Sequence, residues 1–489
     1  METNSLIGIN KTENSTKESE NDEDTLSTSE YQTPWISIYI AGICAFIQAV
    51  QFSIYASSMW PYLRKLDPLI SESSYGTILT AYSIAQCVGA PTFGVWSNKI
   101  KQIRLPLFVG FTSMTLGNAI YLLLERVPIS WIIFVMMATR FTVGAGSGNI
   151  TLLRAYVSTV STKDDRMRAV SCVSGGIAVG SMIGPALQLL FTPLGENGFS
   201  VFGFFQFNVY TGPAILSLIL NLAGIFLVKF CFNETILPFD CEDGSKPGSR
   251  VRADVLALFI IIATRFSQIF LHSTTDMINS PFTMMMFEFT KEEAVKYNAL
   301  VYAVAGSLGA LMYVFFIVFN VGKRLNSRAC CILAQITFVI MFIATYQWPF
   351  LSKKVGLRVD GSDYGCDSDR FTWCENLTVN SIWLYYAFYI FVFGISYALL
   401  NATLNTLYSH IIGPQRQGTL QGIFQVAGSI ARIIAPLNTS YLYTKSGPRI
   451  VWGVEAVEAA AVLSLWFIFF RRLIPYEESQ KKKTKPTEV

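Results

Sequence analysis

The sequence predicts an all-α membrane protein with twelve transmembrane helices in two six-helix bundles. Two observations predict this fold class. Of the 489 residues, 52% are apolar and only 14% are charged, and the mean hydropathy is +0.42, a balance typical of a chain surrounded by lipid. Apolar runs of about 20 residues, the length that a helix needs to cross the hydrocarbon core, also recur from Ile36 to Phe470.

The first half of the chain contains six apolar runs. Polar segments separate them, including basic stretches that begin at Lys99 and Lys163. The expected spans are 36–58, 75–97, 105–124, 131–153, 168–191 and 208–230. They predict an N-terminal bundle over residues 36–230. Residues 1–35 are polar and acidic, so we expect a disordered tail with no cleaved signal peptide.

A polar stretch over residues 231–252 then interrupts the pattern. Pro238, Gly244, Pro247 and Gly248 prevent a continuous helix there, so we interpret it as a linker between bundles. The remaining spans are expected at 253–277, 297–320, 329–350, 381–407, 419–441 and 451–470. They predict a C-terminal bundle over residues 253–470 and a basic tail over residues 471–489.

Lysine and arginine positions predict the orientation. An even number of spans places both termini on one side, and the loops on that side carry the larger share of the lysines and arginines. Because such residues concentrate in cytosolic loops, we expect both termini in the cytosol. The net charge of +4 therefore reflects membrane topology and gives no indication of nucleic-acid binding.

The long loop between spans nine and ten carries two cysteines and a sequon. Cys366 and Cys374 lie close together in this non-cytosolic loop, where a disulfide is expected; two unpaired thiols are the alternative. Asn376-Leu-Thr378 in the same loop is a glycosylation sequon, so Asn376 is a candidate for a glycan.

A faint internal repeat supports the division into two bundles. Tyr156 precedes Pro185 by 29 residues and Tyr408 precedes Pro436 by 28, with a basic loop and a glycine-rich helix between them in each case. Two related bundles around a site at the membrane midplane are typical of secondary transporters. We therefore interpret the chain as a transporter.

One arginine stands near the middle of a strongly apolar run. Gly144 and Gly148 follow Arg140 at four-residue spacing, so all three share a helix face on which the glycines admit a neighbouring helix. We expect the guanidinium group to point into the same seam. An intramembrane charge is costly and usually marks an ion or substrate path, although a structural bond to backbone carbonyls is an equal alternative.

Several segments resemble signatures of the major facilitator superfamily. They are Gly94-Val-Trp-Ser-Asn98-Lys99, Arg140-Phe-Thr-Val-Gly144-Ala-Gly146, and the glycine-rich stretch from Gly176 to Gly184-Pro185. The resemblance implies twelve helices in two bundles that rock against each other. The superfamily usually has aspartate where this chain has Asn98, so the charged lock between the bundles is weakened or rebuilt.

The same resemblance implies that the fourth, seventh and eleventh spans line a central cavity. Each carries an intramembrane arginine, which makes the cavity net positive and favours anions. The candidate pathway residues are Arg140, Arg265, Arg432, Asp276, Gln48 and Gln86. Purely structural roles are the alternative for the arginines, and interhelical contacts for the glutamines.

Other polar residues near the spans have simpler interpretations. Arg154 is expected one turn from the cytosolic end of its helix, as an interfacial anchor. Glu455 and Glu458 are expected near the membrane interface. Gly184-Pro185 is expected to bend or thin its helix for packing, because proline leaves a backbone carbonyl without its helical partner.

A narrower resemblance is to the lysosomal ceroid lipofuscinosis type-7 protein family. It is carried by Ser58-Met-Trp60-Pro61-Tyr62, Gly94-Val-Trp96-Ser97-Asn98, Glu293-Ala-Val-Lys-Tyr297-Asn298, Trp373-Cys374 and the segment 428–436. It implies a late-endosomal or lysosomal membrane and transport of small solutes, with chloride conduction attributed to the family. Glu2, Leu6 and Ile7 are similar to an acidic dileucine signal that clathrin adaptors bind.

Three functions remain open at this point. The first is a carrier, which works either by alternating access on a small anion or by proton coupling on a metabolite. The second is a chloride-conducting channel on the same fold, and the third is a membrane scaffold. The sequence shows no enzyme motif, and it contains only His272 and His410 as histidines. We therefore expect no cofactor and no metal site.

Overall fold

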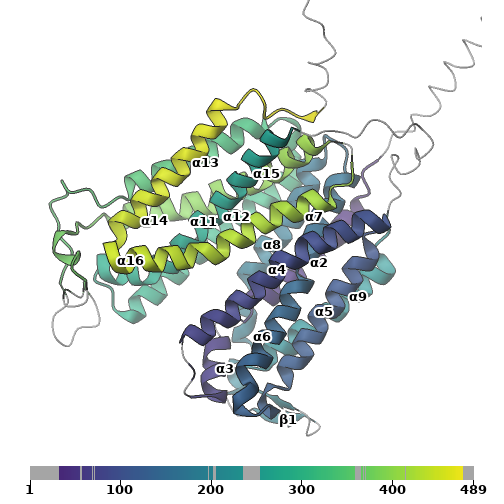
Figure 1. The fold of residues 1–489 in the computed structure, drawn as a ribbon, viewed down its shortest axis with the longest axis horizontal. Coiled ribbons are helices and arrows are strands. Elements are labelled where there is room, and N and C mark those ends of the chain that lie inside the picture. Colours follow the sequence, from purple (N-terminus) through teal and green to yellow (C-terminus); the bar gives the residue numbers. More distant parts are fainter. Residues whose placement is uncertain are drawn as a thin grey trace, which may run out of the picture.

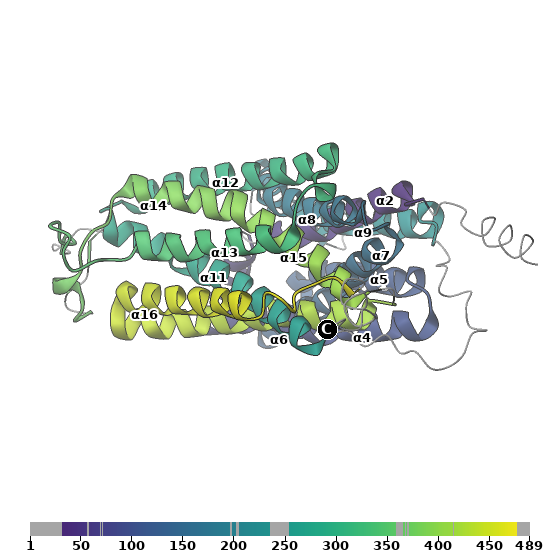
Figure 2. The ribbon, with the colours of Figure 1, turned by 90° about the horizontal axis from the view of Figure 1, so that it is seen from above.

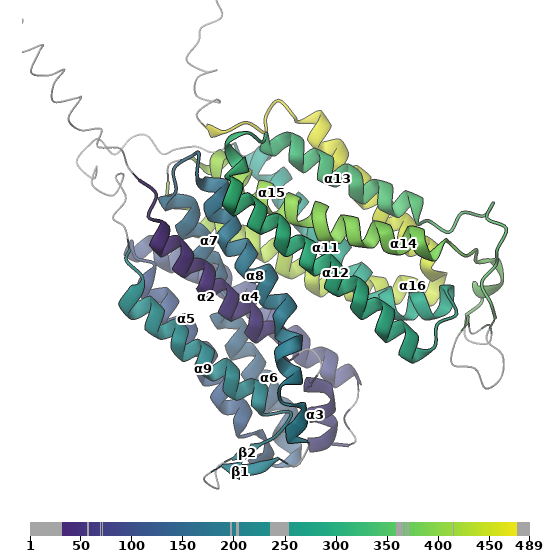
Figure 3. The ribbon, with the colours of Figure 1, turned by 180° about the vertical axis from the view of Figure 1, so that it is seen from behind.

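The computed structural model describes residues 32–476, except 56–57, 69, 71, 196–197, 202–204, 235–253, 358–364, 367, 369–370 and 414. Glu2, Leu6 and Ile7, most of the predicted linker and most of the predicted basic tail lie outside the described residues. The described helices form two bundles that meet at one end and diverge toward the other (Figures 1 and 3). We call the end where α2 begins the terminal side, and the opposite end the distal side.

The N-terminal bundle contains six spans. Its long helices are α2 (Trp35–Ser53), α4 (Glu72–Ile100), α5 (Arg104–Leu122), α6 (Ile129–Gly146) continued by α7 (Asn149–Val160), α8 (Arg166–Leu189), and α9 (Gly212–Phe226) continued by the π-helix η3 (Leu227–Cys231). Shorter elements join them: α3 (Met59–Leu66), η1 (Leu124–Arg126), η2 (Thr192–Leu194), and the antiparallel strands β1 (Phe199–Val201) and β2 (Phe205–Phe207). The fourth span therefore extends beyond the predicted residue 153.

The C-terminal bundle contains the other spans. Its elements are α11 (Val255–Met286), α12 (Lys291–Phe319), η4 (Val321–Lys323), α13 (Ser327–Ala344), η5 (Cys374–Asn376), α14 (Ile382–Tyr389), the π-helix η6 (Ile390–Ser396), α15 (Tyr397–Ile412) and α16 (Gly418–Ile468). A capping box fixes the start of α12, because the Thr290 hydroxyl accepts from the backbone N–H of Glu293 while the Glu293 carboxylate accepts from that of Thr290.

Helix α16 provides the last two spans. At about 1.5 Å per residue, its 51 residues would measure about 76 Å, far more than one membrane crossing. Gly447 interrupts it with a φ of 77°, a left-handed conformation that favours glycine, and Pro448 follows. Eleven of the described helices are long and apolar enough to cross a membrane. With α16 divided at Gly447, the predicted twelve-span fold is confirmed.

Glycines allow the helices of the N-terminal bundle to touch at their backbones. A Cβ at Gly176 would lie 2.3 Å from the carbonyl oxygen of Gly42 in α2, and one at Gly184 would meet the Ser53 hydroxyl. A Cβ at Gly144 would lie 2.4 Å from the carbonyl oxygen of Tyr82, and Gly148 packs against Phe93 and Gly89, all in α4. Such contacts supply van der Waals packing, the main attraction between helices in lipid.

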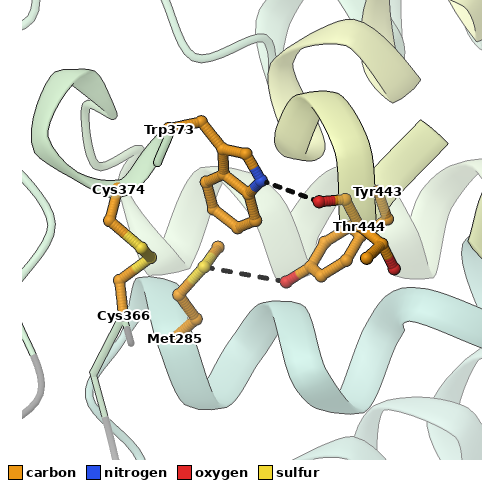
Figure 4. The surroundings of a disulfide bond; sticks show 6 residues. All are labelled: Met285, Cys366, Trp373, Cys374, Tyr443 and Thr444. Atoms are coloured by element: carbon orange, nitrogen blue, oxygen red, sulfur yellow. Dashed lines mark hydrogen bonds between the residues drawn. A yellow bond between two sulfur atoms is a disulfide. The ribbon is translucent and has the colours of Figure 1, made fainter. Parts of the chain in front are cut away.

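The loop between α13 and α14 covers the turn of α16 on the distal side (Figures 2 and 4). Cys366 and Cys374 form a disulfide in this loop. The Trp373 ring lies against Gly447 and its Nε1 donates to the Thr444 carbonyl at 3.4 Å. Arg449 donates to the carbonyl oxygens of Gln347 and Asn376, each at 3.0 Å. The Asn376 side chain is exposed, and its glycosylation stays a prediction.

Candidate functional site

The two bundles approach most closely where α4 crosses the start of α16. A Cβ at Gly94 would lie 2.3 Å from the carbonyl oxygen of Gly418, so only glycine fits this crossing. One turn away, the Asn98 amide donates to the Thr419 hydroxyl at 2.9 Å. Lys99 is exposed beside this contact. Where the superfamily usually has a charged lock, this chain holds its bundles together with a neutral hydrogen bond.

Gln86 makes a second connection between the bundles, farther toward the distal side. Its amide donates to the Ser147 hydroxyl at 2.9 Å and accepts from the Ser429 hydroxyl at 2.9 Å. Ser147 joins α6 to α7, whereas Ser429 lies in α16. The Gln86 side chain is fully buried. It therefore links three helices from two bundles.

Arg154 makes a third connection, and our sequence interpretation of this residue is wrong. The apolar run ends near residue 153, but α7 continues to Val160 because the other bundle covers it. Arg154 is consequently buried, and its Nη1 donates to Gln425 Oε1 of α16 at 2.8 Å. It makes a buried contact between the bundles, so its guanidinium group does not reach outward as an interfacial anchor would.

Arg265 lies on the other side of α16, within the C-terminal bundle. Its Nη1 donates to Gln268 Oε1 and to Asn401 Oδ1, both at 2.9 Å. The guanidinium group also lies 5.3 Å from the centre of the Phe424 ring. Asn401 in turn donates to the Tyr313 hydroxyl at 2.8 Å, which fixes the amide that receives Arg265.

Arg432 is a third arginine near Arg154 and Arg265. Gln425, Ser429 and Arg432 lie on one face of α16 at helical spacing, so Arg432 follows the two cross-bundle contacts on the distal side, where the bundles separate. It is partly exposed and has no hydrogen bond or ion pair with the described residues. Pro436, one turn later, lacks the N–H that would bond the Arg432 carbonyl.

Arg154, Arg265 and Arg432, which we call the arginine layer, lie within electrostatic range of one another. Among the described residues, none of the three has a carboxylate at ion-pair distance. Their fixed partners are neutral amide oxygens. Three mutually repelling guanidinium groups therefore lie near one another, on and beside α16, without a carboxylate at ion-pair distance among the described residues.

The last span carries two carboxylates, those of Glu455 and Glu458, and Glu458 bonds to α11. Ser267 donates to Glu458 Oε2 at 2.8 Å, and Glu455 is buried with its Oε2 unpartnered among the described atoms. Glu455 lies about two turns after Pro448, where the second segment of α16 begins, and the proximity of both glutamates to the membrane interface stays a prediction. Neither carboxylate neutralises the arginine layer.

Arg140 is placed differently from our expectation. Gly144 and Gly148 pack on α4 as predicted from their spacing, but the Arg140 guanidinium lies over the rings of Tyr55, just after α2, and Tyr121 in α5, 4.1 and 5.3 Å from their centres. Arg140 is buried in this aromatic cage. These aromatic contacts favour a structural role for Arg140.

Two further candidates lie on the walls of the bundles. Gln48 is buried in α2, and its amide atoms have no partner among the described atoms. Asp276 in α11 pairs with His272 Nδ1 at 3.0 Å. On the terminal side of the arginine layer, a cavity of about 350 Å³ is lined in part by Asn98, Tyr156 and Arg416. The described residues include no cluster of His, Cys, Asp or Glu that could hold a metal.

Comparison with known proteins agrees with this geometry. The family model described as Major Facilitator Superfamily matches residues 41–359 and 371–489. The chain belongs to the Major Facilitator Superfamily. As a member of this family it is a membrane transporter, not an enzyme, which confirms the broader resemblance found in its motifs.

Individual relatives cover most or part of the chain. Major facilitator superfamily domain-containing protein 8 of Xenopus laevis is 28% identical over 479 residues, covering 91% of this chain and 93% of that protein. Multidrug resistance protein 2 of Bacillus subtilis (strain 168) is 25% identical over 161 residues, covering 33% and 36% of the two chains.

Solved structures show the same fold. The human organic anion transporter MFSD10 (TETRAN) is similar with a TM-score of 0.63 at 15% identity, covering 89% of this chain and 100% of that one. The proton:xylose symporter XylE is similar with a TM-score of 0.63 at 14% identity, covering 89% and 95%. At these identities the likeness concerns the fold alone.

The neutral lock at Asn98 makes a testable prediction. Asn98→Asp places a carboxylate beside the first turn of α16, where the partial positive charge of a helix N-terminus adds about 0.3–1 kcal/mol of stabilisation. The form closed on the terminal side should gain about two- to fivefold in population. Distances between spin labels at Lys99→Cys and Ala329→Cys, in a background without other free cysteines, report that population.

Asn98→Leu is the matched control, because it removes the hydrogen bond to Thr419 without adding charge and should shift the population the opposite way. Identical distance distributions for Asn98→Asp, Asn98→Leu and the parent would show that this contact does not hold the bundles together.

Proposed function

We propose that this transporter carries a small anion, chloride foremost, across a lysosomal or late-endosomal membrane. The arginine layer is the observation that supports the proposal. Guanidinium groups removed from water and lacking a carboxylate partner raise the free energy of the protein, and like charges close together raise it further. A mobile anion that enters between the bundles relieves both effects, so the site favours negative solutes.

The arrangement of the charges also suggests where the anion binds. Arg154 and Arg265 are each hydrogen-bonded to amide oxygens, so they supply a positive field from fixed positions. Arg432 is partly exposed and follows Gln425 and Ser429 in α16. We infer that Arg432 makes the direct contact with the anion, while the two buried arginines raise its affinity through their field.

The contacts between bundles favour alternating access over an open channel. The bonds made by Gln86, Asn98 and Arg154 all lie between the arginine layer and the terminal side or within the layer itself. An anion that arrives from the distal side would meet these contacts as a barrier. They must break before it can leave on the terminal side, as expected when one bundle rocks against the other.

The cellular address rests on the sequence. The resemblance to the lysosomal family, the signal at Glu2, Leu6 and Ile7, and the distribution of lysine and arginine support a lysosomal or late-endosomal membrane with the terminal side in the cytosol. A clathrin adaptor is the partner that would read the signal. In this orientation the disulfide loop and Asn376 lie in the lumen.

Replacing the partly exposed Arg432 tests the proposed function directly. A hydrogen bond to a charged group contributes about 1.5–3 kcal/mol, so Arg432→Gln should lower chloride flux about 10- to 100-fold. Arg432→Lys should recover part of it, because an ammonium keeps the charge but loses the planar fork. Flux is measured in proteoliposomes with labelled chloride, and with lactate and succinate as alternative anions.

Arg471→Gln, at an exposed arginine beyond α16, is the matched control for loss of one positive charge and should transport like the parent. Arg140→Gln should reduce thermal stability because its aromatic cage loses the cation. If Arg432→Gln folds and carries every tested anion at the parental rate, the anion proposal loses its physical basis. A parent that carries none of them would instead favour a scaffold or a different solute.

The address has its own test. Leu6→Ala together with Ile7→Ala removes the apolar pair that an adaptor would bind, so a fluorescently tagged variant should accumulate at the plasma membrane. Ser5→Ala, next to the pair, should leave the distribution unchanged. Lysosomal staining that persists in the double variant at the parental level would contradict the assignment of this signal.

A further inference from the structure

A histidine and an aspartate form an ion pair on the distal side of the arginine layer. His272 Nδ1 lies 3.0 Å from Asp276 Oδ2, and Asp276 Oδ1 accepts from the Tyr389 hydroxyl at 3.0 Å. The two side chains remain 36% and 44% exposed. Both are therefore accessible while the carboxylate is already oriented by two partners.

The pair shares a helix face with the arginine layer. Arg265, Gln268, His272 and Asp276 follow one another in α11 at intervals of three and four residues, so they line one side of the helix. His272 lies seven residues beyond Arg265, a rise of about 10 Å along the axis. An anion that enters from the distal side therefore passes His272 before it reaches Arg265.

Arg432 is the charged residue in the described surroundings of the His272–Asp276 pair. Among the described residues, the titratable or charged groups that face it from the helices packed around it are Tyr302 of α12, Tyr385 and Tyr389 of α14, Tyr397 of α15 and Arg432 of α16. The His272 ring packs against Tyr397 and the edge of Phe393, with ring centres 5.0 and 5.3 Å apart. His272 therefore has two charged neighbours, Asp276 and Arg432, and Arg432 is the residue that we assign to anion binding.

We propose that His272 and Asp276 bind a proton whose uptake is coupled to anion binding at the arginine layer. The ring nitrogen Nδ1 carries the hydrogen that faces Asp276, so the incoming proton binds Nε2. The pair then changes from a net charge of −1 to zero. This inference rests on the proposed anion transport and specifies how that transport is regulated.

Electrostatics gives the sign of the coupling. Protonation adds a positive charge to His272, which lies within electrostatic range of Arg432, so the anion site becomes more positive and the protonated protein binds the anion more tightly. By linkage, the bound anion favours proton uptake by the same factor. Because histidine ordinarily titrates near pH 6.5, proton and anion would enter together from an acidic distal side and leave together on a neutral terminal side.

The chain offers a direct readout of this proton. It contains two histidines, so His410→Gln leaves His272 as the single histidine signal in a protein labelled with ¹⁵N-histidine. In nanodiscs at pH 6.5, saturating chloride should increase the protonated fraction of His272, whereas gluconate, a bulky anion, should not. The effect of chloride should vanish in the additional variant Arg432→Gln.

Binding provides a second readout. Chloride should raise the thermal midpoint of the parent with an apparent affinity about tenfold higher at pH 5.0 than at pH 7.5, a coupling within the usual range. His272→Gln should bind chloride with the same affinity at both pH values. Tyr389→Phe, which removes a hydroxyl but neither titrating group, should retain the pH dependence. A purely structural role for His272 would lower stability without removing that dependence.

The outcomes separate this inference from the function on which it depends. Chloride binding that is equally tight at both pH values, with no change at His272, would overturn the proton site and leave anion transport intact. A pH dependence that persists in His272→Gln would overturn it as well. Absence of binding by chloride, lactate and succinate at both pH values would overturn the anion proposal, and the coupling with it.

Discussion

Arg154 and Arg265 are buried without a carboxylate at ion-pair distance among the described residues, and Arg432 lies within electrostatic range of both. Burial of an unpaired charge is among the costliest events in a protein interior, and it is costlier in a membrane, where little water can screen it. Here Arg154 and Arg265 are held by the amide oxygens of Gln425, Gln268 and Asn401. Neutral acceptors orient the charges but do not cancel them, and the residual field is what an anion would bind.

Hydrogen bonds between the bundles couple the positive field of the arginines to the relative position of the two bundles. Arg154 bonds across the bundle interface, and Gln86 and Asn98 bond across it in parallel on α4. Backbone contact at Gly94 and Gly418 brings these side chains within reach of each other. Because a charged residue participates directly in the closure, binding of an anion near Arg154 would alter the strength of the contact that must break during transport.

The fold was largely predictable because it depends on local signals. Composition along the chain is enough to recognise apolar runs of membrane length, the polar linker and the bias of lysine and arginine between loops. The glycine spacing in the fourth span also correctly indicated a close helix contact. The direction of the Arg140 side chain was not predictable, because Tyr55 and Tyr121 come from other segments of the chain. Arg154 was misinterpreted because the apolar run ends before its helix does and because its partner Gln425 comes from the other bundle.

The site depends on pairings that no spacing within one helix can specify. Arg154 with Gln425, and Asn98 with Thr419, join residues that are far apart in the chain. The sequence indicated that Asn98 departs from the usual charged residue, yet only the tertiary structure shows which hydroxyl replaces the lost ion pair. The His272–Asp276 spacing of four residues was visible in the sequence, and its place on the face of Arg265 could have been deduced from helical periodicity.

The most direct test of the arginine layer is to locate a bound anion. Crystals of the protein grown in bromide, measured at the bromine absorption edge, should show an anomalous peak beside the guanidinium group of Arg432, within the field of Arg154 and Arg265, and the peak should disappear in Arg432→Gln. Absence of a peak in the parent, with each of the three arginines bonded to a carboxylate of the chain, would contradict the account.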